Sequence, residues 1–196
     1  MPKLRGDSPI IRPPQAARAA LAKLTPTYFL VYSTAEPQIK FFAECLEIVF
    51  GNHFRLIKTP GDLVSDKSQH DVIMDLIDQC AFGVVCLDGL RPNVVFEYGI
   101  LRGAKKPVLL FKEEAATVDV EHFYGGAKLG VGPPKIDVDK FFSDTKDKFH
   151  LSWNRFAIRD TIKLIWDEYR KKKDDIKGYV DIPKPTDYND IRIRNL

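Results

Sequence analysis

Short apolar runs rich in β-branched and aromatic residues recur along the chain, and the gap after each run is long enough for one helix. The runs predict buried strands at residues 27–33, 54–58, 82–88 and 107–112. The run FGVVCLD is apolar without alternation, which is typical of a parallel strand covered on both faces. Strand and helix alternate, so we expect right-handed crossovers and a doubly wound sheet.

The segments between these runs have helical periodicity. They predict helices over residues 37–51, over a segment that ends at Cys80, and over residues 94–106. Pro37 near the first turn and Gly51 at the end are typical boundaries of the first helix. Ser65 or Asp66 is the expected cap of the second.

The pattern weakens after residue 112. A fifth strand is expected at residues 116–120 or at residues 135–141, within a stretch rich in glycine, proline and charge. That stretch is either a functional loop or a disordered insertion. Residues 152–173 then predict an amphipathic helix, with Phe156 among the residues of its apolar side.

These elements predict an α/β fold, a three-layer α/β/α domain built on a parallel sheet of about five strands. The domain is expected over residues 27–173. Residues 1–26 contain five prolines and are expected to form an N-terminal arm with at most a short helix. Residues 174–196 are expected to form an extended C-terminal tail.

Composition narrows the class of protein. The 30 basic and 27 acidic residues give a net charge of +3, too balanced to argue for nucleic-acid binding. No apolar run reaches the roughly 20 residues that cross a bilayer, and the N-terminus does not resemble a signal peptide, so a cytoplasmic protein is expected. The three cysteines favour reduced core thiols, and the scattered histidines make a metal site improbable.

Ligands of doubly wound sheets bind beyond the carboxyl ends of the strands. Three loops leave such ends here. The first contains Ser33 and Thr34, the second contains Asp62, and the third begins at Asp88. Ser33 and Thr34 are either ligand contacts or ordinary turn residues.

The third loop, DGLRPN, contains the most residues that could bind a ligand. Either Pro92 takes the first position of the next helix or Asn93 caps it, and the N-terminus of that helix offers free N–H groups to an anion. Arg91 suits a phosphate clamp, or alternatively an ion pair with Asp88. Glu97 lies one helical turn after Asn93, so the two are expected to share a helix face.

Glu97 has two interpretations. A carboxylate within an apolar helix, facing the strand ends, is either paired or used in chemistry. Alternatively, Glu97 is a surface residue that pairs with Arg102 or Lys105. Spacing alone does not separate these interpretations.

The run GVVCLDGLRPNVVFEYGILRGAKKPVLLF resembles two related families. One comprises the prokaryotic TIR-like (Toll/interleukin-1 receptor-like) nucleotide-binding proteins, and the other the nucleoside 2-deoxyribosyltransferase-like proteins. The resemblance is close over residues 82–111 and only topological over residues 27–80. It implies a flavodoxin-like fold. Tyr98 stands where many relatives carry Leu, beside the position of the catalytic glutamate.

The resemblance implies that Glu97 is catalytic and that Asp88, Arg91 and Asn93 border a bound nucleotide. By the same resemblance, Ser33 and Thr34 help to hold ribose or phosphate. Asp62 is also expected to border the nucleotide. Where a leaving base needs a general acid, Asp62 and Glu36 are the candidates. A cationic nicotinamide needs none, which favours NAD⁺.

The function that the resemblance implies is a TIR-like NAD⁺ glycohydrolase acting in prokaryotic defence. NAD⁺ would be its substrate, and no cofactor is expected. Expected partners are further copies of the chain, as a homo-oligomer, or a sensor protein, without membrane or direct nucleic-acid binding. The alternatives are a deoxyribosyltransferase-like N-glycosidase acting on nucleosides or nucleotides, and a non-catalytic nucleotide-binding signalling module.

Overall fold

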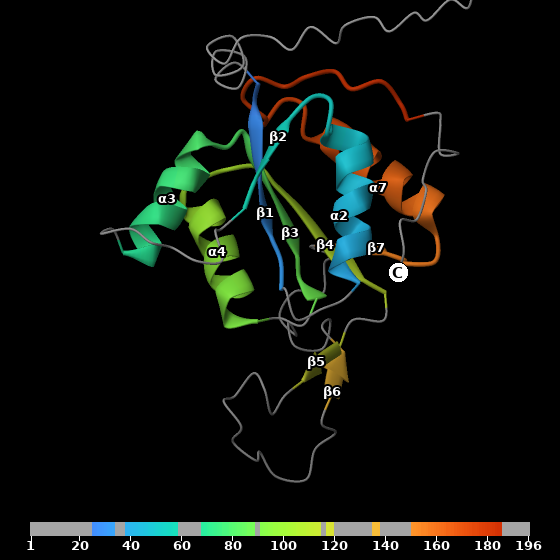
Figure 1. Cartoon of the computed structure of the whole chain (residues 1–196), viewed down its shortest axis with the longest axis horizontal. Helices are drawn as coiled ribbons and strands as arrows, with labels where there is room; N and C mark the ends of the chain where they lie inside the picture. Colours follow the sequence, from blue (N-terminus) through green and yellow to red (C-terminus); the bar gives the residue numbers. More distant parts are fainter. Residues whose placement is uncertain are drawn as a thin grey trace, which may run out of the picture.

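Five parallel strands form one sheet at the centre of the domain (Figure 1). The computed structural model describes residues 25–33, 38–58, 68–88, 91–114, 117–119, 135–137 and 150–185. In chain order the strands of the sheet are β1 (Thr27–Val31), β2 (Arg55–Ile57), β3 (Phe82–Cys86), β4 (Val108–Glu113) and β7 (Leu151–Trp153). The first four are the strands that the apolar runs predict.

The order of strands in the sheet is β2-β1-β3-β4-β7, with every neighbouring pair parallel. Counting only the strands of this sheet, the order is that of a flavodoxin-like fold. The chain departs from a plain version because a separate antiparallel ribbon, β5 (Thr117–Asp119) and β6 (Lys135–Asp137), is inserted before β7. The strand order reverses between β1 and β3, which is where such folds bind ligands.

Helices cover both faces of the sheet in the part of the chain that the structure describes (Figure 1). Helices α2 (Ile39–Phe50) and α7 (Ile158–Lys171) lie together on one face. Helices α3 (Gln69–Gln79) and α4 (Pro92–Gly103) lie on the other. The predicted three-layer α/β/α architecture is therefore confirmed. None of these described helices is long and apolar enough to cross a membrane.

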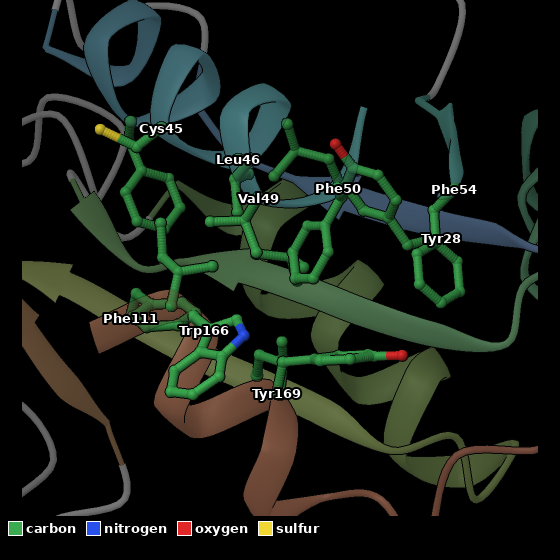
Figure 2. Packing of buried hydrophobic residues seen from close by; sticks show 14 of the residues in the cluster. Tyr28, Cys45, Leu46, Val49, Phe50, Phe54, Phe111, Trp166 and Tyr169 are labelled. Atoms are coloured by element: carbon green, nitrogen blue, oxygen red, sulfur yellow. The ribbon is translucent and has the colours of Figure 1, made fainter. Parts of the chain in front are cut away.

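The core on the α2/α7 face is strongly aromatic (Figure 2). Phe50 and Tyr169 pack edge to face, with ring centroids 5.3 Å apart. Tyr28 and Phe82 from neighbouring strands stack at 5.7 Å. The core on the α3/α4 face is aliphatic in the main. Because both faces are buried, the central strands β3 and β4 carry no polar side chain until β4 approaches its carboxyl end.

Three predictions about element boundaries were wrong. The fifth strand of the sheet is β7, whereas residues 116–120 and 135–141 supply the two strands of the separate ribbon. The last helix begins at Ile158, because the residues before it form β7 and a turn. Helix α3 is capped by Ser68, whose Oγ accepts the N–H of Asp71 at 3.2 Å, and not by Ser65 or Asp66.

The C-terminal segment also differs from the extended tail that the sequence predicts. Residues 174–185 form no helix or strand, but they pack against the α2/α7 core. Ile176 and Ile182 are buried there, and Trp166 Nε1 donates a hydrogen bond to the Ile182 carbonyl at 3.0 Å. The apolar side chains and the indole N–H therefore extend the packed unit beyond residue 173. Residues 186–196 and the arm at 1–24 lie outside the described residues.

Candidate functional site

Polar side chains become buried where the central strands end. Asp88 follows β3 and is 1% exposed, Lys112 in β4 is 2% exposed, and Glu97 in α4 is 6% exposed. Ser33 after β1 and Glu113 in β4 are buried as well. Burying charged groups is costly unless they are paired or used. This concentration of charge at the carboxyl end of the sheet marks it as the candidate site.

Glu97 lies on the side of α4 that packs against the sheet. Val94 and Leu101, three residues before it and four after it, are both fully buried on the same side. Helix α4 packs against β1 and β3, the two strands between which the order reverses. The carboxylate is thus buried at the switch point of the sheet.

The burial of Glu97 decides between the two interpretations of the sequence. Arg102 and Lys105, its expected partners on the surface, are exposed, whereas Glu97 is not. The interpretation of Glu97 as a surface residue is therefore wrong. Asn93 is exposed, so its spacing from Glu97 does not place the two side chains in one environment.

Helix α4 begins at Pro92, which was one of the two predictions, and is not capped by Asn93, which was the other. Pro92 is the first helical residue, and Arg91 takes the capping position without a side-chain hydrogen bond to the helix. Pro92 fits because its ring fixes a helical φ and the N–H that it lacks would have no partner in the helix. Arg91 is half-buried. Thr34, expected to hold ribose or phosphate, and the candidate acids Glu36 and Asp62 lie outside the described residues.

Side-chain alternation in β4 divides the buried charges between the two faces. Leu110 belongs to the core under α3 and α4, and Phe111 to the core under α2 and α7. Because successive side chains of a strand point to opposite faces, Lys112 lies on the same face as Leu110 and Glu113 on the same face as Phe111. Lys112 is therefore on the α4 side, with Glu97.

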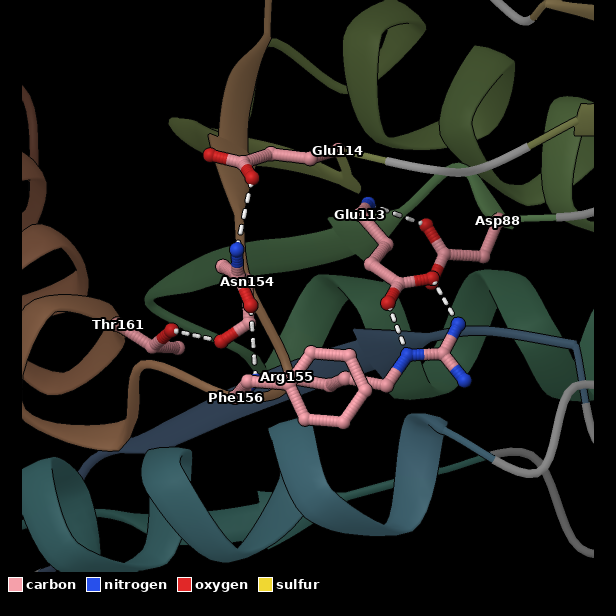
Figure 3. Close-up of polar contacts among 7 residues, drawn as sticks. All are labelled: Asp88, Glu113, Glu114, Asn154, Arg155, Phe156 and Thr161. Carbon is pink, nitrogen blue, oxygen red and sulfur yellow. Dashed lines mark hydrogen bonds and ion pairs between the residues drawn. The ribbon is translucent and has the colours of Figure 1, made fainter.

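A hydrogen-bonded chain joins three strand ends on the other face (Figure 3). Asp88 Oδ1, after β3, accepts the backbone N–H of Glu113 at 2.7 Å. The Glu113 carboxylate accepts hydrogen bonds from both Nε and Nη2 of Arg155, which follows β7. This bidentate pair fixes the plane of the guanidinium group. Arg155 is 38% exposed, so it also reaches the solvent at the carboxyl end of the sheet.

The turn that carries Arg155 is held by Asn154 (Figure 3). Asn154 Oδ1 accepts the N–H of Phe156 at 2.8 Å, and its Nδ2 donates to Glu114 Oε2 at 2.8 Å. The Thr161 hydroxyl donates to the Asn154 carbonyl at 3.0 Å, which ties the turn to α7. Phe156, expected on the apolar side of the last helix, instead projects from this turn and is 90% exposed.

Sequence reasoning missed Lys112, Glu113 and Arg155. The first two end an apolar run, and a strand that ends in Lys-Glu gives no signal of burial. Arg155 was assigned to a helix, and its partner Glu113 is 42 residues away in the chain. Pairing at that separation is set by the order of strands, which local periodicity does not reveal.

Cys86, two residues before Asp88, is not a nucleophile. Complete burial, and then the charge of Asp88, raise the pKa of the Cys86 thiol well above its ordinary value. A neutral, enclosed thiol does not attack a substrate. Among the described residues no group of three or more His, Cys, Asp or Glu side chains is arranged to hold a metal ion.

A groove of about 610 Å³ lies at the opposite end of the sheet. It is lined by the start of β1 at Thr27, the end of α3 at Cys80, Lys106 and Lys177. Lys106 Nζ donates to the carbonyl oxygens of Asp78 and Cys80 and so closes the end of α3. This groove contains none of the buried carboxylates, so it is not part of the candidate site.

A scan of the sequence against protein-family models finds no match, and a search of curated proteins finds no significant match.

Proposed function

We propose that the protein is an N-glycosyl hydrolase of the TIR-like kind, which cleaves the bond between nicotinamide and ribose in NAD⁺. The single observation that carries this proposal is the burial of Glu97 at the switch point between β1 and β3. A carboxylate in that place is positioned toward the region where doubly wound sheets bind nucleotides. The likeness of residues 82–111 to the TIR-like proteins supports the same role.

The chemistry needs one carboxylate. The C1′–N bond breaks with its electron pair going to the pyridinium nitrogen, which neutralises the nicotinamide as it leaves. Positive charge develops on C1′ and the ring oxygen, as in glycoside hydrolysis, and the Glu97 carboxylate stabilises it. Water then adds to C1′ and loses a proton to the carboxylate or to solvent, which yields ADP-ribose.

Among the described residues, the other buried carboxylates at the carboxyl end of the sheet favour a cationic leaving group over a neutral base. A neutral purine or pyrimidine generally needs a proton as it leaves, and the donor must be a protonated acid. Asp88 accepts a backbone N–H, and Glu113 accepts two guanidinium hydrogen bonds. Both carboxylates are thus engaged as hydrogen-bond acceptors within the protein. Nicotinamide in NAD⁺ requires no such donor.

Only the resemblance supports a role in defence. It alone also supports assembly into homo-oligomers or with a sensor protein. The same holds for a cytoplasmic location. The alternatives remain cleavage or transfer on deoxynucleosides and nucleotide binding without catalysis.

A chromatographic assay separates these functions. The protein is incubated over a range of concentrations, with and without a crowding agent, with NAD⁺ or with deoxyadenosine and thymidine. Release of nicotinamide by wild-type protein, lost in Glu97→Gln, is the expected result. Release of adenine or thymine instead would replace this proposal by the transferase-like function. Binding of NAD⁺ with no base released would leave a nucleotide-binding module.

A further inference from the structure

The outer side of helix α3 carries a row of three carboxylates. Asp71, Asp75 and Asp78 are all exposed, and their spacing of four and then three residues places them on one side of the helix. Helix α3 contains neither lysine nor arginine. Met74 follows Asp71 by three residues and precedes Asp78 by four, so it lies beside this row, and it is only half-buried. The outer side of α3 therefore offers negative charge together with an apolar side chain.

The N-terminal arm joins the domain beside the end of α3. Thr27, the first residue of β1, donates its hydroxyl to the Gln79 carbonyl of α3 at 2.9 Å. Pro26 lines the same groove as Asp78. Figure 1 shows the start of β1 and the end of α3 at one end of the sheet. Residues 1–24, which precede this junction, are therefore tethered within reach of the Asp78 carboxylate.

The arm carries the opposite charge to α3. Five of residues 1–24 are basic and one is acidic: Lys3, Arg5, Arg12, Arg18, Lys23 and Asp7. The part nearest the domain, QAARAALAKL at residues 15–24, has Arg18 and Lys23, no acidic residue, and otherwise almost only alanine and leucine. These ten residues would span about 15 Å as a helix, and the eleven residues of α3 span about 16 Å. The segment thus matches α3 in charge, in apolar content and in length.

Charges elsewhere at this end of the sheet direct the arm toward α3. Beyond α3, the charged residues that line the groove are three lysines and one aspartate: Lys105, Lys106, Lys177 and Asp175. A basic segment that crossed the groove would meet this net positive charge. Helix α2, on the other face of the sheet, exposes Glu44 and Glu47 but also Lys40. Of the four described helices, only α3 has exposed charged side chains of negative sign alone.

We infer that residues 15–24 dock along the outer side of α3 of the same chain. The segment runs back from the start of β1, so Lys23 lies at the Asp78 end and Arg18 lies nearer Asp75, while its apolar side chains cover part of the helix. The short connection to β1 keeps the segment at a high effective concentration beside α3, which favours docking within one chain over docking on a second copy. The inference does not depend on the proposed function.

Carbodiimide cross-linking of the full chain, read by mass spectrometry, tests the docking. The reagent joins a lysine amine to a carboxylate that it contacts, so the expected product links Lys23 to Asp78 or Asp75. Lys23→Arg keeps the positive charge but removes the amine, and the product should disappear. In a mixture of isotope-labelled and unlabelled protein, each cross-linked product should contain one isotopic form only.

Hydrogen exchange followed by mass spectrometry measures the docking without a chemical link. The amides of residues 15–24 should exchange about three- to tenfold faster in Asp75→Asn/Asp78→Asn than in the wild type, because two exposed ion pairs are lost. Glu44→Gln/Glu47→Gln on α2 is the matched control, with two exposed carboxylates neutralised, and it should leave the exchange unchanged. Both double variants should keep the wild-type melting temperature, since the substituted side chains are exposed.

Three results would overturn the inference. One is equal exchange of residues 15–24 in the wild type and in the α3 variant. Another is the absence of the Lys23 product, or a product with Glu44 or Glu47 in its place. The third is a product that joins labelled to unlabelled protein, which would show that α3 binds the arm of a second copy instead.

Discussion

The Leu101 side chain of α4 occupies the space that a side chain on Gly83 of β3 would need. A Cβ atom placed on Gly83 would lie 2.6 Å from Leu101 Cδ1, closer than real contacts allow. Leu101 is fully buried and has Glu97 one turn before it on the same side of the helix. The absence of a side chain at Gly83 therefore allows α4 to approach the sheet closely enough to bury Glu97.

Gly83→Ala is expected to destabilise the protein by about 1–3 kcal/mol, as overpacking of a core does. Chemical denaturation measures this loss. Gly99→Ala on the exposed side of α4 is the control: a Cβ there meets nothing within 4 Å, and alanine favours the helix by about 0.5–1 kcal/mol. If Gly83→Ala were as stable as Gly99→Ala, the proposed close approach of α4 would be contradicted.

Arg155→Ala is expected to cost about 1–3 kcal/mol of stability. Removing one partner of a buried ion pair leaves an uncompensated charge, here on Glu113, although partial exposure of Arg155 reduces the cost. Lys171→Ala removes a surface pair with Glu168 and should cost less than about 1 kcal/mol. Equal unfolding midpoints for the two variants would show that the Glu113–Arg155 pair does not stabilise the fold.

The buried thiols make stability depend on alkaline pH. Burial raises the pKa of Cys80 to about 11 and that of Cys45 to about 12, from an ordinary value of 9.0. The folded state therefore favours the neutral thiols. This contribution to stability is complete below pH 9.0 and is lost as pH rises through the folded-state values.

Denaturant titrations should accordingly show falling stability between pH 9.0 and about 12. Thiol labelling offers a second measurement. At pH 8 the native protein should react with iodoacetamide far more slowly than the unfolded chain, because all three cysteines are buried. Rapid native labelling at pH 8 would contradict the burial of the thiols.

Ile182→Ala is expected to destabilise the protein by about 2–4 kcal/mol, since it removes a buried side chain from the C-terminal segment. Lys184→Ala, at an exposed position of the same segment, should be close to neutral. Thermal unfolding of both variants tests whether residues 174–185 belong to the folded unit. Indistinguishable melting temperatures would show that they do not.

The sequence predicts the strands up to β4 better than it predicts the edge strand β7. Strands β1, β3 and β4 are largely apolar runs, so their pattern alone locates them. Strand β7 has only three residues, and it precedes an amphipathic helix whose periodicity extends back over it. Phe156 fits that periodicity and was placed in the helix for that reason.

Of the buried charged residues at the carboxyl end of the sheet, some could be predicted from the sequence and others could not. Glu97 was singled out because a carboxylate stands out within an apolar helix, and its burial agrees with the first of its two interpretations. Arg155 was missed because only the pairing of β4 with β7 brings it to Glu113. A local pattern predicts which residues are buried, whereas the order of strands decides which distant charges meet.

Nicotinamide release from NAD⁺ by Glu97→Gln tests the central claim most directly. Gln has the size of Glu, so the variant should fold with a melting temperature near that of the wild type, while release falls by about a hundredfold or more because the charge that stabilises C1′ is gone. Glu114→Gln removes an exposed carboxylate beside the same strand end and should release nicotinamide at the wild-type rate. Undiminished release by a folded Glu97→Gln variant would contradict the account.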